Sequence, residues 1–190
     1  MKSKEPRVIV ISSVSGGGKN TVVRRLLEQT SDLAVAITAT SRPPRQGEKH
    51  GQDYLFLDRQ DFERRVERGE FLEHAIVHGN MYGVPESSVR DIVDGGQSAV
   101  LIIDVQGRRH IKDRMGDRVL SIFLEPPNRQ EWEERLRHRG TDSEKDIQLR
   151  LQDGLNELEE ADQFDYRVVN DSIEACCQKI VDILQKEGAI

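Results

Sequence analysis

Hydrophobic residues recur along the chain in short continuous runs that alternate with longer segments of helical periodicity. Runs that are apolar at every position are typical of strands buried on both faces of a sheet. Strands are predicted at 7–12, 34–37, 99–104, 119–124 and 166–169. Helices are predicted at 20–29, 129–138, 145–160 and 173–186. Strands separated by helices favour a parallel sheet with helices on both faces, which places the chain in the α/β class.

The stretch between residues 40 and 93 has a different pattern. Proline and glycine recur at short intervals, and the strand candidate at 53–57 is rich in aromatic residues. We expect a small insertion that contains some antiparallel sheet. Residues 139–143 interrupt two helices and are predicted to form a mobile connection.

Composition and charge narrow the class of protein. The 190 residues, 33% of them charged and 36% hydrophobic, are typical of one globular domain. A net charge of −6 disfavours general nucleic-acid binding. No apolar run approaches the length of a membrane span, and the start shows no secretory signal, so we expect a cytoplasmic protein with no membrane partner. The adjacent Cys176 and Cys177 favour neither a disulfide nor zinc, and are expected to be small buried residues of a helix.

The segment after the first strand reads Ser13-Val-Ser-Gly-Gly-Gly-Lys-Asn-Thr. Glycines at a strand-to-helix turn let backbone N–H groups approach phosphate oxygens, and Lys19 extends toward the outer phosphates. The full pattern is GxxxxGK[ST], and this chain departs from it at both ends. Ser13 stands where the first glycine is expected, and Asn20 stands where the serine or threonine is expected. An ordinary glycine-rich turn is the alternative, but the strand before and the helix after favour a phosphate cradle. Asn20 is a weak candidate for magnesium, and Thr21 is not assigned to that role.

Two arginines in the insertion predict a second anion site. Arg42 and Arg45 flank two prolines that stiffen the backbone, and Tyr54 follows nearby. Guanidinium groups bind phosphate oxygens in pairs, and a tyrosine hydroxyl adds a neutral donor. For the two arginines alone, a solvated basic loop would be the simpler interpretation.

The segment 38–56 resembles the nucleotide-monophosphate-binding region of guanylate kinases, with its TRxPRxGExxGxDYxF pattern. Ser41 stands where the preceding TTR motif has its second Thr. Later matching segments, in the family's order, are 69–75 (GEFLEHA), 82–83 (YG), 103–107 (IDVQG), 135–143 (RLRHRGTDS), 150–151 (RL), 164–166 (FDY) and 169–171 (VND). The resemblance therefore covers nearly the whole chain, from residue 7 to the last helix.

The resemblance implies a fold and a reaction. The fold is a P-loop NTPase-type parallel sheet with helices on both faces, a small GMP-binding insertion and a lid. Within one domain it divides the chain into a core (1–37, 94–138 and 153–190), a GMP-binding lobe (38–93) and a lid (139–152). The reaction is transfer of the γ-phosphoryl group of ATP to GMP or dGMP, with Mg²⁺ accompanying ATP, in purine nucleotide metabolism. The implied partners are small-molecule substrates only, and the sequence does not set the oligomeric state.

The resemblance also assigns roles to residues. The GMP phosphate is expected at Arg42, Arg45, Tyr54 and Tyr82, and the guanine at Thr38, Glu73 and Asp104. The ATP-binding residues are expected to be Ser15, Gly16, Gly17, Gly18, Lys19, Asn20, Thr21 and Asn170, the last near adenine. The catalytic charges are expected from Lys19, Arg42, Arg139 and Arg150.

The chemistry of Glu73 agrees with its assigned role. Guanine presents two adjacent donors, N1–H and the N2 amino group, and an ionised carboxylate offers two acceptor oxygens for them. Adenine lacks that donor pair, so a buried carboxylate would be left unpaired against it. The alternative is an ordinary surface glutamate, which the neighbouring Phe71, Leu72 and Ala75 disfavour.

Three positions depart from the family's pattern. Val84 replaces a hydroxyl residue and removes one expected hydrogen bond to guanine. Ile102 replaces an acid that lies near magnesium in relatives, and Asn20 replaces the hydroxyl ligand. Because two of these bear on metal handling, a GMP-binding module with weak or no catalysis remains the second hypothesis, against which the lid arginines argue. A kinase for another nucleoside monophosphate would require Glu73 to play no part.

Overall fold

A computed structural model describes residues 5–77, 79–138 and 144–190. The larger part of the protein is built on a five-stranded sheet in the order β2-β7-β1-β8-β9, and every pair of neighbouring strands is parallel. The strands are β1 (Val8–Ser13), β2 (Leu33–Val35), β7 (Ser98–Ile102), β8 (Val119–Glu125) and β9 (Tyr166–Val169). The sheet confirms the predicted α/β class.

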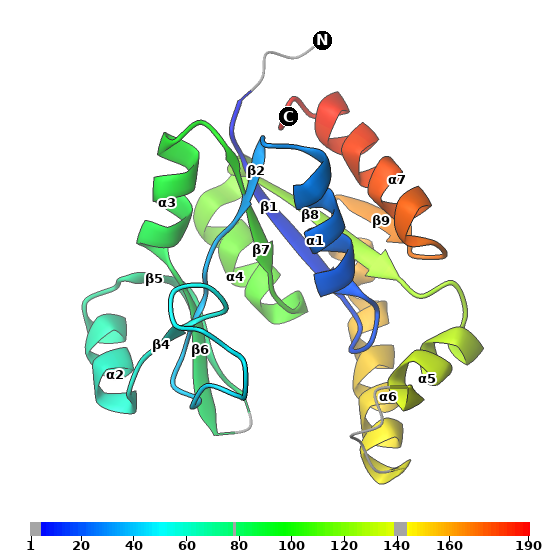
Figure 1. The fold of residues 1–190 in the computed structure, drawn as a ribbon, viewed down its shortest axis with the longest axis horizontal. Coiled ribbons are helices and arrows are strands. Elements are labelled where there is room, and N and C mark those ends of the chain that lie inside the picture. The colour runs from blue at the N-terminus through cyan, green and yellow to red at the C-terminus, as the bar shows by residue number, and fades with distance from the viewer. Residues whose placement is uncertain (1–4, 78, 139–143) are drawn as a thin grey trace.

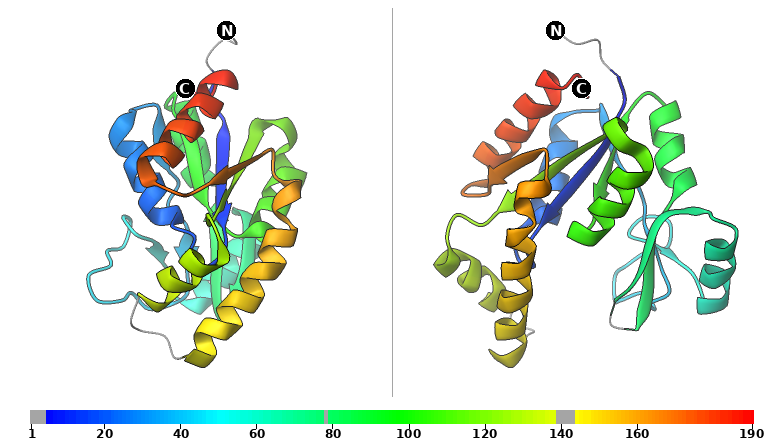
Figure 2. Two further views of the ribbon diagram at one scale, coloured as in Figure 1. Left: turned by 90° about the vertical axis from the view of Figure 1, so that its right-hand side faces the viewer. Right: turned by 180° about the vertical axis from the view of Figure 1, so that it is seen from behind.

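Alternation along the central strand explains why helices cover both faces of the sheet (Figure 2). Val8 and Val10 of β1 pack in one apolar cluster, while Ile9 and Ile11 pack in another on the opposite face. The first cluster includes residues of α3 (Glu86–Asp94), α4 (Val105–Met115), α5 (Arg129–Arg137) and α6 (Glu144–Glu159). The second includes residues of α1 (Lys19–Gln29) and α7 (Ile173–Lys186). Cys176 and Cys177 are fully buried in α7, as the sequence predicts.

The insertion forms a small lobe around a second sheet, of order β4-β3-β6-β5. Its elements are β3 (Ala39–Thr40), β4 (Leu55–Phe56), α2 (Arg59–Glu67), β5 (Phe71–Val77) and β6 (Asn80–Pro85). The β3–β6 and β5–β6 pairs are antiparallel, whereas β3 and β4 run parallel. Phe62 of α2 stacks on Phe71 of β5, with ring centroids 4.5 Å apart, and these rings are the centre of the lobe's own core.

Some elements differ from the sequence prediction. The strand expected at 99–104 ends at Ile102, because the Asp104 side chain accepts a hydrogen bond from Gly107 N (2.8 Å) and caps α4. The strand expected at 34–37 is observed at Leu33–Val35, and the one at 53–57 shortens to Leu55–Phe56. The hydrophobic periodicity of the sequence did not predict helices α2, α3 and α4. In α2 and α3 a single residue is fully buried in each, so the apolar face is narrow.

The phosphate-loop segment, the small lobe and the helices α5 and α6 meet around one end of the parallel sheet. The loop after β1 lies at this end, with the small lobe on one side and α5 and α6 on the other (Figure 1). Two 3₁₀ turns, Gly116–Arg118 and Ala161–Gln163, precede β8 and β9. Among the described residues, no helix has both the length and the apolar character required to cross a membrane.

Candidate active site

The loop between β1 and α1 has the shape of a phosphate cradle. Gly16 and Gly18 have φ angles of 84° and 90°, in the left-handed region that favours glycine. Gly18 is the N-cap of α1 and offers no side-chain cap. The backbone N–H groups of a helix N-terminus are suited to binding an anion. The Lys19 ammonium folds back over the loop and donates to Ser13 O at 2.5 Å.

Ser13 replaces the first glycine of the usual pattern, and the loop accommodates it. A Cβ atom added to Gly17 would lie 1.6 Å from Ser13 Oγ, so the serine hydroxyl occupies the space beside that glycine. Ser13 is fully buried, and its hydroxyl donates to Val14 O at 3.1 Å. The departure at Ser13 is therefore compatible with the cradle, provided that residue 17 has no side chain.

Asn170 lies directly beneath the phosphate loop. Its side-chain amide donates to Gly17 O (2.8 Å), and only 4% of the residue is exposed. Arg135 of α5 donates to the Asn170 carbonyl oxygen at 3.0 Å. A hollow of about 500 Å³ opens beside these residues. The hollow is lined by Gly16, Gly18, Thr21, Arg135, Asn170, Asp171, Ser172, Ile173 and Glu174.

A second hollow, of about 340 Å³, lies between the start of α1 and the small lobe, and we call it the arginine hollow. It is lined by Asn20, Val35, Ala36, Ile37, Thr38, Arg42, Arg45, Glu48, Gln52, Asp53, Tyr54, Tyr82 and Ile102. Arg42 forms a two-pronged ion pair with Glu48, both oxygens lying 2.9 Å from Nη2. Its guanidinium carbon also lies 5.6 Å from the centre of the Tyr54 ring and 5.8 Å from that of Phe56. These contacts hold the guanidinium in one orientation.

Glu48 organises the rest of the arginine hollow. It accepts a hydrogen bond from the backbone N–H of Arg45 at 2.7 Å in addition to the pair with Arg42. The Arg45 amide and the Arg42 guanidinium lower the pKa of Glu48 below its usual value. The side chain of Arg45 is exposed at the rim. Tyr54 and Tyr82 pack edge to face at 6.3 Å, and burial raises the pKa of Tyr54, so this hydroxyl stays a neutral donor.

A third hollow, of about 190 Å³, adjoins the second, and we call it the carboxylate hollow. It is lined by Thr38, Tyr54, Glu73, Ala75, Val77, Tyr82, Gly83, Ile102, Ile103 and Asp104. Burial, and secondarily the charge of Asp104, raise the pKa of Glu73 to about 7. Thr38, Tyr54, Tyr82 and Ile102 line both hollows, so the two form one continuous site with arginines at one end and carboxylates at the other.

Comparison with known proteins decides the family. The family model for guanylate kinase matches residues 5–187.

The chain belongs to the guanylate kinase family.

Curated guanylate kinases resemble it over most of their length. The guanylate kinase of Syntrophomonas wolfei is 44% identical over 180 residues, which cover 95% of this chain and 92% of the relative. That of the Wolbachia of Brugia malayi is 39% identical over 180 residues, covering 95% and 92%. The crystal structure of guanylate kinase from Anaplasma phagocytophilum superimposes with a TM-score of 0.79 at 36% identity, covering 99% of this chain and 89% of that one.

The guanylate kinase fold brings most of the sequence-predicted residues together. They line the arginine hollow and the carboxylate hollow, or belong to the phosphate loop and the hollow beside it. Asn20, at the start of α1, lines the arginine hollow. Arg150 lies apart from the lobe, on α6, and donates to Ser15 Oγ at 3.1 Å. Arg139 and the connection at 139–143 lie outside the described residues.

The departures from the guanylate kinase pattern occupy different environments. Val84 is fully buried in the main core and lies opposite Glu73 in the β5–β6 ladder. Ile102 is only partly buried and lines both the arginine and the carboxylate hollows. An apolar side chain therefore lies on the wall that the two hollows share.

Sequence reasoning gave no role to Glu48, Trp132 or Glu157, which contact predicted site residues. Trp132 Nε1 donates to Ser15 O at 2.7 Å, and Ser15 N donates to Glu157 Oε2 at 3.2 Å. The signal that could have identified Glu157 is its spacing of seven residues from Arg150, two turns along one helix face.

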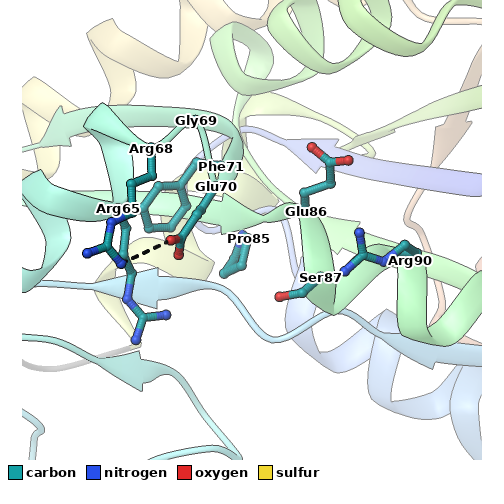
Figure 3. A pocket seen from close by; sticks show the side chains of 9 residues that line it. All are labelled: Arg65, Arg68, Gly69, Glu70, Phe71, Pro85, Glu86, Ser87 and Arg90. Atoms are coloured by element: carbon teal, nitrogen blue, oxygen red, sulfur yellow. Dashed lines mark ion pairs between the residues drawn. The ribbon is translucent and has the colours of Figure 1, made fainter.

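A further hollow, of about 370 Å³, lies outside this site, between the end of α2, the start of β5 and the start of α3 (Figure 3). It is lined by Arg65, Arg68, Gly69, Glu70, Phe71, Pro85, Glu86, Ser87 and Arg90. Arg65 pairs with Asp61 at 3.3 Å and Arg68 with Glu70 at 3.7 Å, so much of the positive charge is neutralised locally.

Proposed function

We propose that the chain transfers the γ-phosphoryl group of ATP to GMP or dGMP, yielding ADP and GDP or dGDP, as a guanylate kinase of purine nucleotide metabolism. The observation that supports this most directly is the position of the arginine hollow. It opens onto Asn20 at the start of α1, directly after the phosphate loop. The two elements that we propose to bind phosphate thus adjoin one another, as transfer between two nucleotides requires.

The two ends of the continuous site suit the two ends of GMP. At the arginine hollow, Arg42, Arg45, Tyr54 and Tyr82 would hold the phosphate. At the carboxylate hollow, Glu73 would accept from guanine N1–H and N2–H, with Asp104 and Thr38 beside it. Because Glu48 already fixes the Arg42 guanidinium, little ordering entropy is lost when the phosphate binds.

ATP would occupy the other side of the loop. Ser15, Gly16, Gly17, Gly18, Lys19, Asn20 and Thr21 would surround its phosphates. Asn170 lines the hollow beside the cradle and would lie near the adenine. Segment 38–93 would then act as the GMP-binding lobe, 139–152 as the lid, and the remainder as the core.

The chemistry requires positioning and charge neutralisation from the protein. An oxygen of the GMP phosphate attacks the γ-phosphorus of ATP, and the bond from that phosphorus to the β–γ bridging oxygen breaks. The attacking oxygen is already anionic, so no general base is required. Lys19, Arg42, Arg139 and Arg150 would neutralise charge that spreads over the transferring group.

Magnesium would enter with ATP. Mg²⁺ prefers oxygen ligands and keeps several waters when phosphates supply the others. The Asn20 amide oxygen suits that role, and no group of three or more acidic, histidine or cysteine side chains is arranged for a metal among the described residues. Bound there, the ion would neutralise the β- and γ-phosphate oxygens of ATP.

The proposed activity is tested by ADP release with GMP, dGMP, AMP, UMP and CMP as acceptors, at saturating magnesium. We expect turnover with GMP at about 1 s⁻¹ or faster, within the range of kinases, and little with the other three ribonucleotides. Micromolar GMP binding by calorimetry without ADP release would instead indicate a binding module. Equal rates with AMP would remove Glu73 from base recognition.

Restoring the usual side chains should change magnesium dependence more than turnover. We expect Asn20→Ser to lower the magnesium concentration for half-maximal rate, with kcat equal or higher, because a hydroxyl is the usual ligand. Calorimetric binding of a non-hydrolysable ATP analogue across a magnesium series gives a readout independent of turnover. Ile102→Asp should change activity modestly. Loss of activity in a folded Asn20→Ser variant would show that Asn20 itself is required.

A further inference from the structure

Every hydrogen-bonding group of Ser15, in the phosphate loop, contacts a side chain from α5 or α6. Its carbonyl oxygen accepts from Trp132 Nε1 at 2.7 Å, and its hydroxyl accepts from Arg150 Nη1 at 3.1 Å. Its N–H donates to Glu157 Oε2 at 3.2 Å. These three contacts, which we call the Ser15 clamp, join the loop to the helices on either side of residues 139–143.

The geometry of α6 brings the clamp residues to one point. Arg150, Gly154 and Glu157 follow one another at spacings of four and three, so they share one face of the helix. A Cβ atom on Gly154 would lie 2.3 Å from Cζ2 of Trp132, so the indole ring fits against α6 only because residue 154 has no side chain. The ring, which is 1% exposed, therefore sets how closely α6 approaches the loop.

Glu157 is the unusual member of the clamp, because it is a carboxylate beside a loop built for anions. It is partly buried, and burial raises its pKa, while the charge of Lys19 and the Ser15 N–H oppose that rise. Removing a carboxylate from water is unfavourable unless a partner compensates for it. Here the compensation comes from the backbone N–H of the phosphate loop and from the lysine that follows it.

We propose that Glu157 is a positioning residue for phosphoryl transfer. It holds the Ser15 peptide against α6, so that the phosphate loop and Arg150 on the same helix keep one relative geometry. Displacements of about 1 Å at reacting groups lower rates by about 10²-fold, so this alignment matters to the reaction. The inference rests on the proposed kinase function and adds a residue to it.

The test compares Glu157→Ala and Glu157→Gln with Glu159→Gln, a matched control at an exposed glutamate of the same helix. We expect Glu157→Ala to raise KM for ATP about 10-fold and to lower kcat about 10-fold, as loss of a partly buried hydrogen bond to a charged group would. KM for GMP should stay within about twofold. Glu157→Gln keeps an acceptor oxygen and should recover both constants to within about threefold, and Glu159→Gln should match the wild type.

Several outcomes would overturn the proposal. Unchanged KM for ATP and unchanged kcat, with only a lower melting temperature, would reduce Glu157 to a structural role. An equal rise in KM for GMP would indicate general distortion of the site. Glutamine behaving like alanine would mean that the charge, and not the hydrogen bond to Ser15, is what matters.

A double-mutant cycle tests whether the clamp acts through Ser15. Trp132→Phe keeps a ring beside Gly154 but removes the donor to Ser15 O. Because both residues act on one peptide, we expect the double variant Glu157→Ala/Trp132→Phe to lose less than the product of the two single losses. Strictly multiplicative losses would contradict a shared clamp.

Calorimetric binding of a non-hydrolysable ATP analogue separates this proposal from the proposed function. If the wild type fails to turn over GMP, the kinase function fails. The Ser15 clamp is still supported if Glu157→Ala weakens analogue binding about 10-fold while Glu157→Gln does not, and it is overturned if both bind like the wild type.

Discussion

Replacing Arg150 with alanine should lower kcat for GDP formation by about 10³-fold while leaving KM for GMP within about threefold. Arginines that stabilise the charge of a transferring phosphoryl group contribute 10³- to 10⁵-fold in related reactions. Arg150 lies on α6 beside Ser15, away from the arginine and carboxylate hollows that would hold GMP. Its loss should therefore affect the transition state far more than acceptor binding.

Steady-state kinetics at saturating ATP, with GMP affinity by calorimetry, would measure this effect. Arg150→Lys should fall between alanine and wild type, since it keeps the charge but loses the planar pair of donors. Arg129→Ala, at an exposed arginine at the start of α5, is the matched control and should behave as wild type. A loss of less than 10-fold in Arg150→Ala would remove Arg150 from the catalytic set.

Glu73→Gln should lower kcat/KM for GMP by about 10²-fold or more. The amide replaces one acceptor oxygen with a donor that would face the donors of guanine, and unpaired buried polar groups discriminate strongly between substrates. Glu70→Gln is the matched control, because that glutamate precedes the same strand but lies beside Arg68, in the hollow between α2 and α3. An unchanged preference for GMP over AMP in Glu73→Gln would exclude Glu73 from the guanine site.

The pH dependence gives Glu73 a second signature. With its pKa raised to about 7, the free protein holds Glu73 mostly protonated at pH 6 and mostly ionised at pH 8. Guanine requires the ionised form, so kcat/KM for GMP should rise with pH through about 7 and then level off. Ionisation of the GMP phosphate, with a pKa of about 6, adds a second rise to the pH profile of kcat/KM. In Glu73→Gln the rise near pH 6 should remain and the rise near pH 7 should be lost.

The parallel sheet and the phosphate loop were predictable because their determinants are local. Five apolar runs specify buried strands, and each is observed within three residues of its predicted ends. The three glycines and Lys19 specify the turn that follows β1. By contrast, α2 was not predicted, because it buries only Phe62 fully and its other residues are largely charged.

The residues of the arginine and carboxylate hollows could be grouped from the sequence only through family motifs. Glu73 and Tyr82 come from the neighbouring strands β5 and β6, and Thr38 directly precedes β3. The β3–β6 and β5–β6 registers bring the three residues to one hollow. No periodicity in the sequence encodes that register. The raised pKa of Glu73 is likewise a tertiary effect, since burial and the distant Asp104 cause it.

The sequence by itself determined the α/β class, the phosphate loop and the chemical types at both ends of the site, because strand burial, glycine freedom and side-chain chemistry are properties of short segments. Only the tertiary structure decided which side chains hold the phosphate loop and the residues of the site in place. Glu48 orients Arg42 across six residues of loop, whereas Trp132, Arg150 and Glu157 reach Ser15 from more than a hundred residues away. Such contacts depend on how helices pack against the loop, and packing is settled by the whole chain at once.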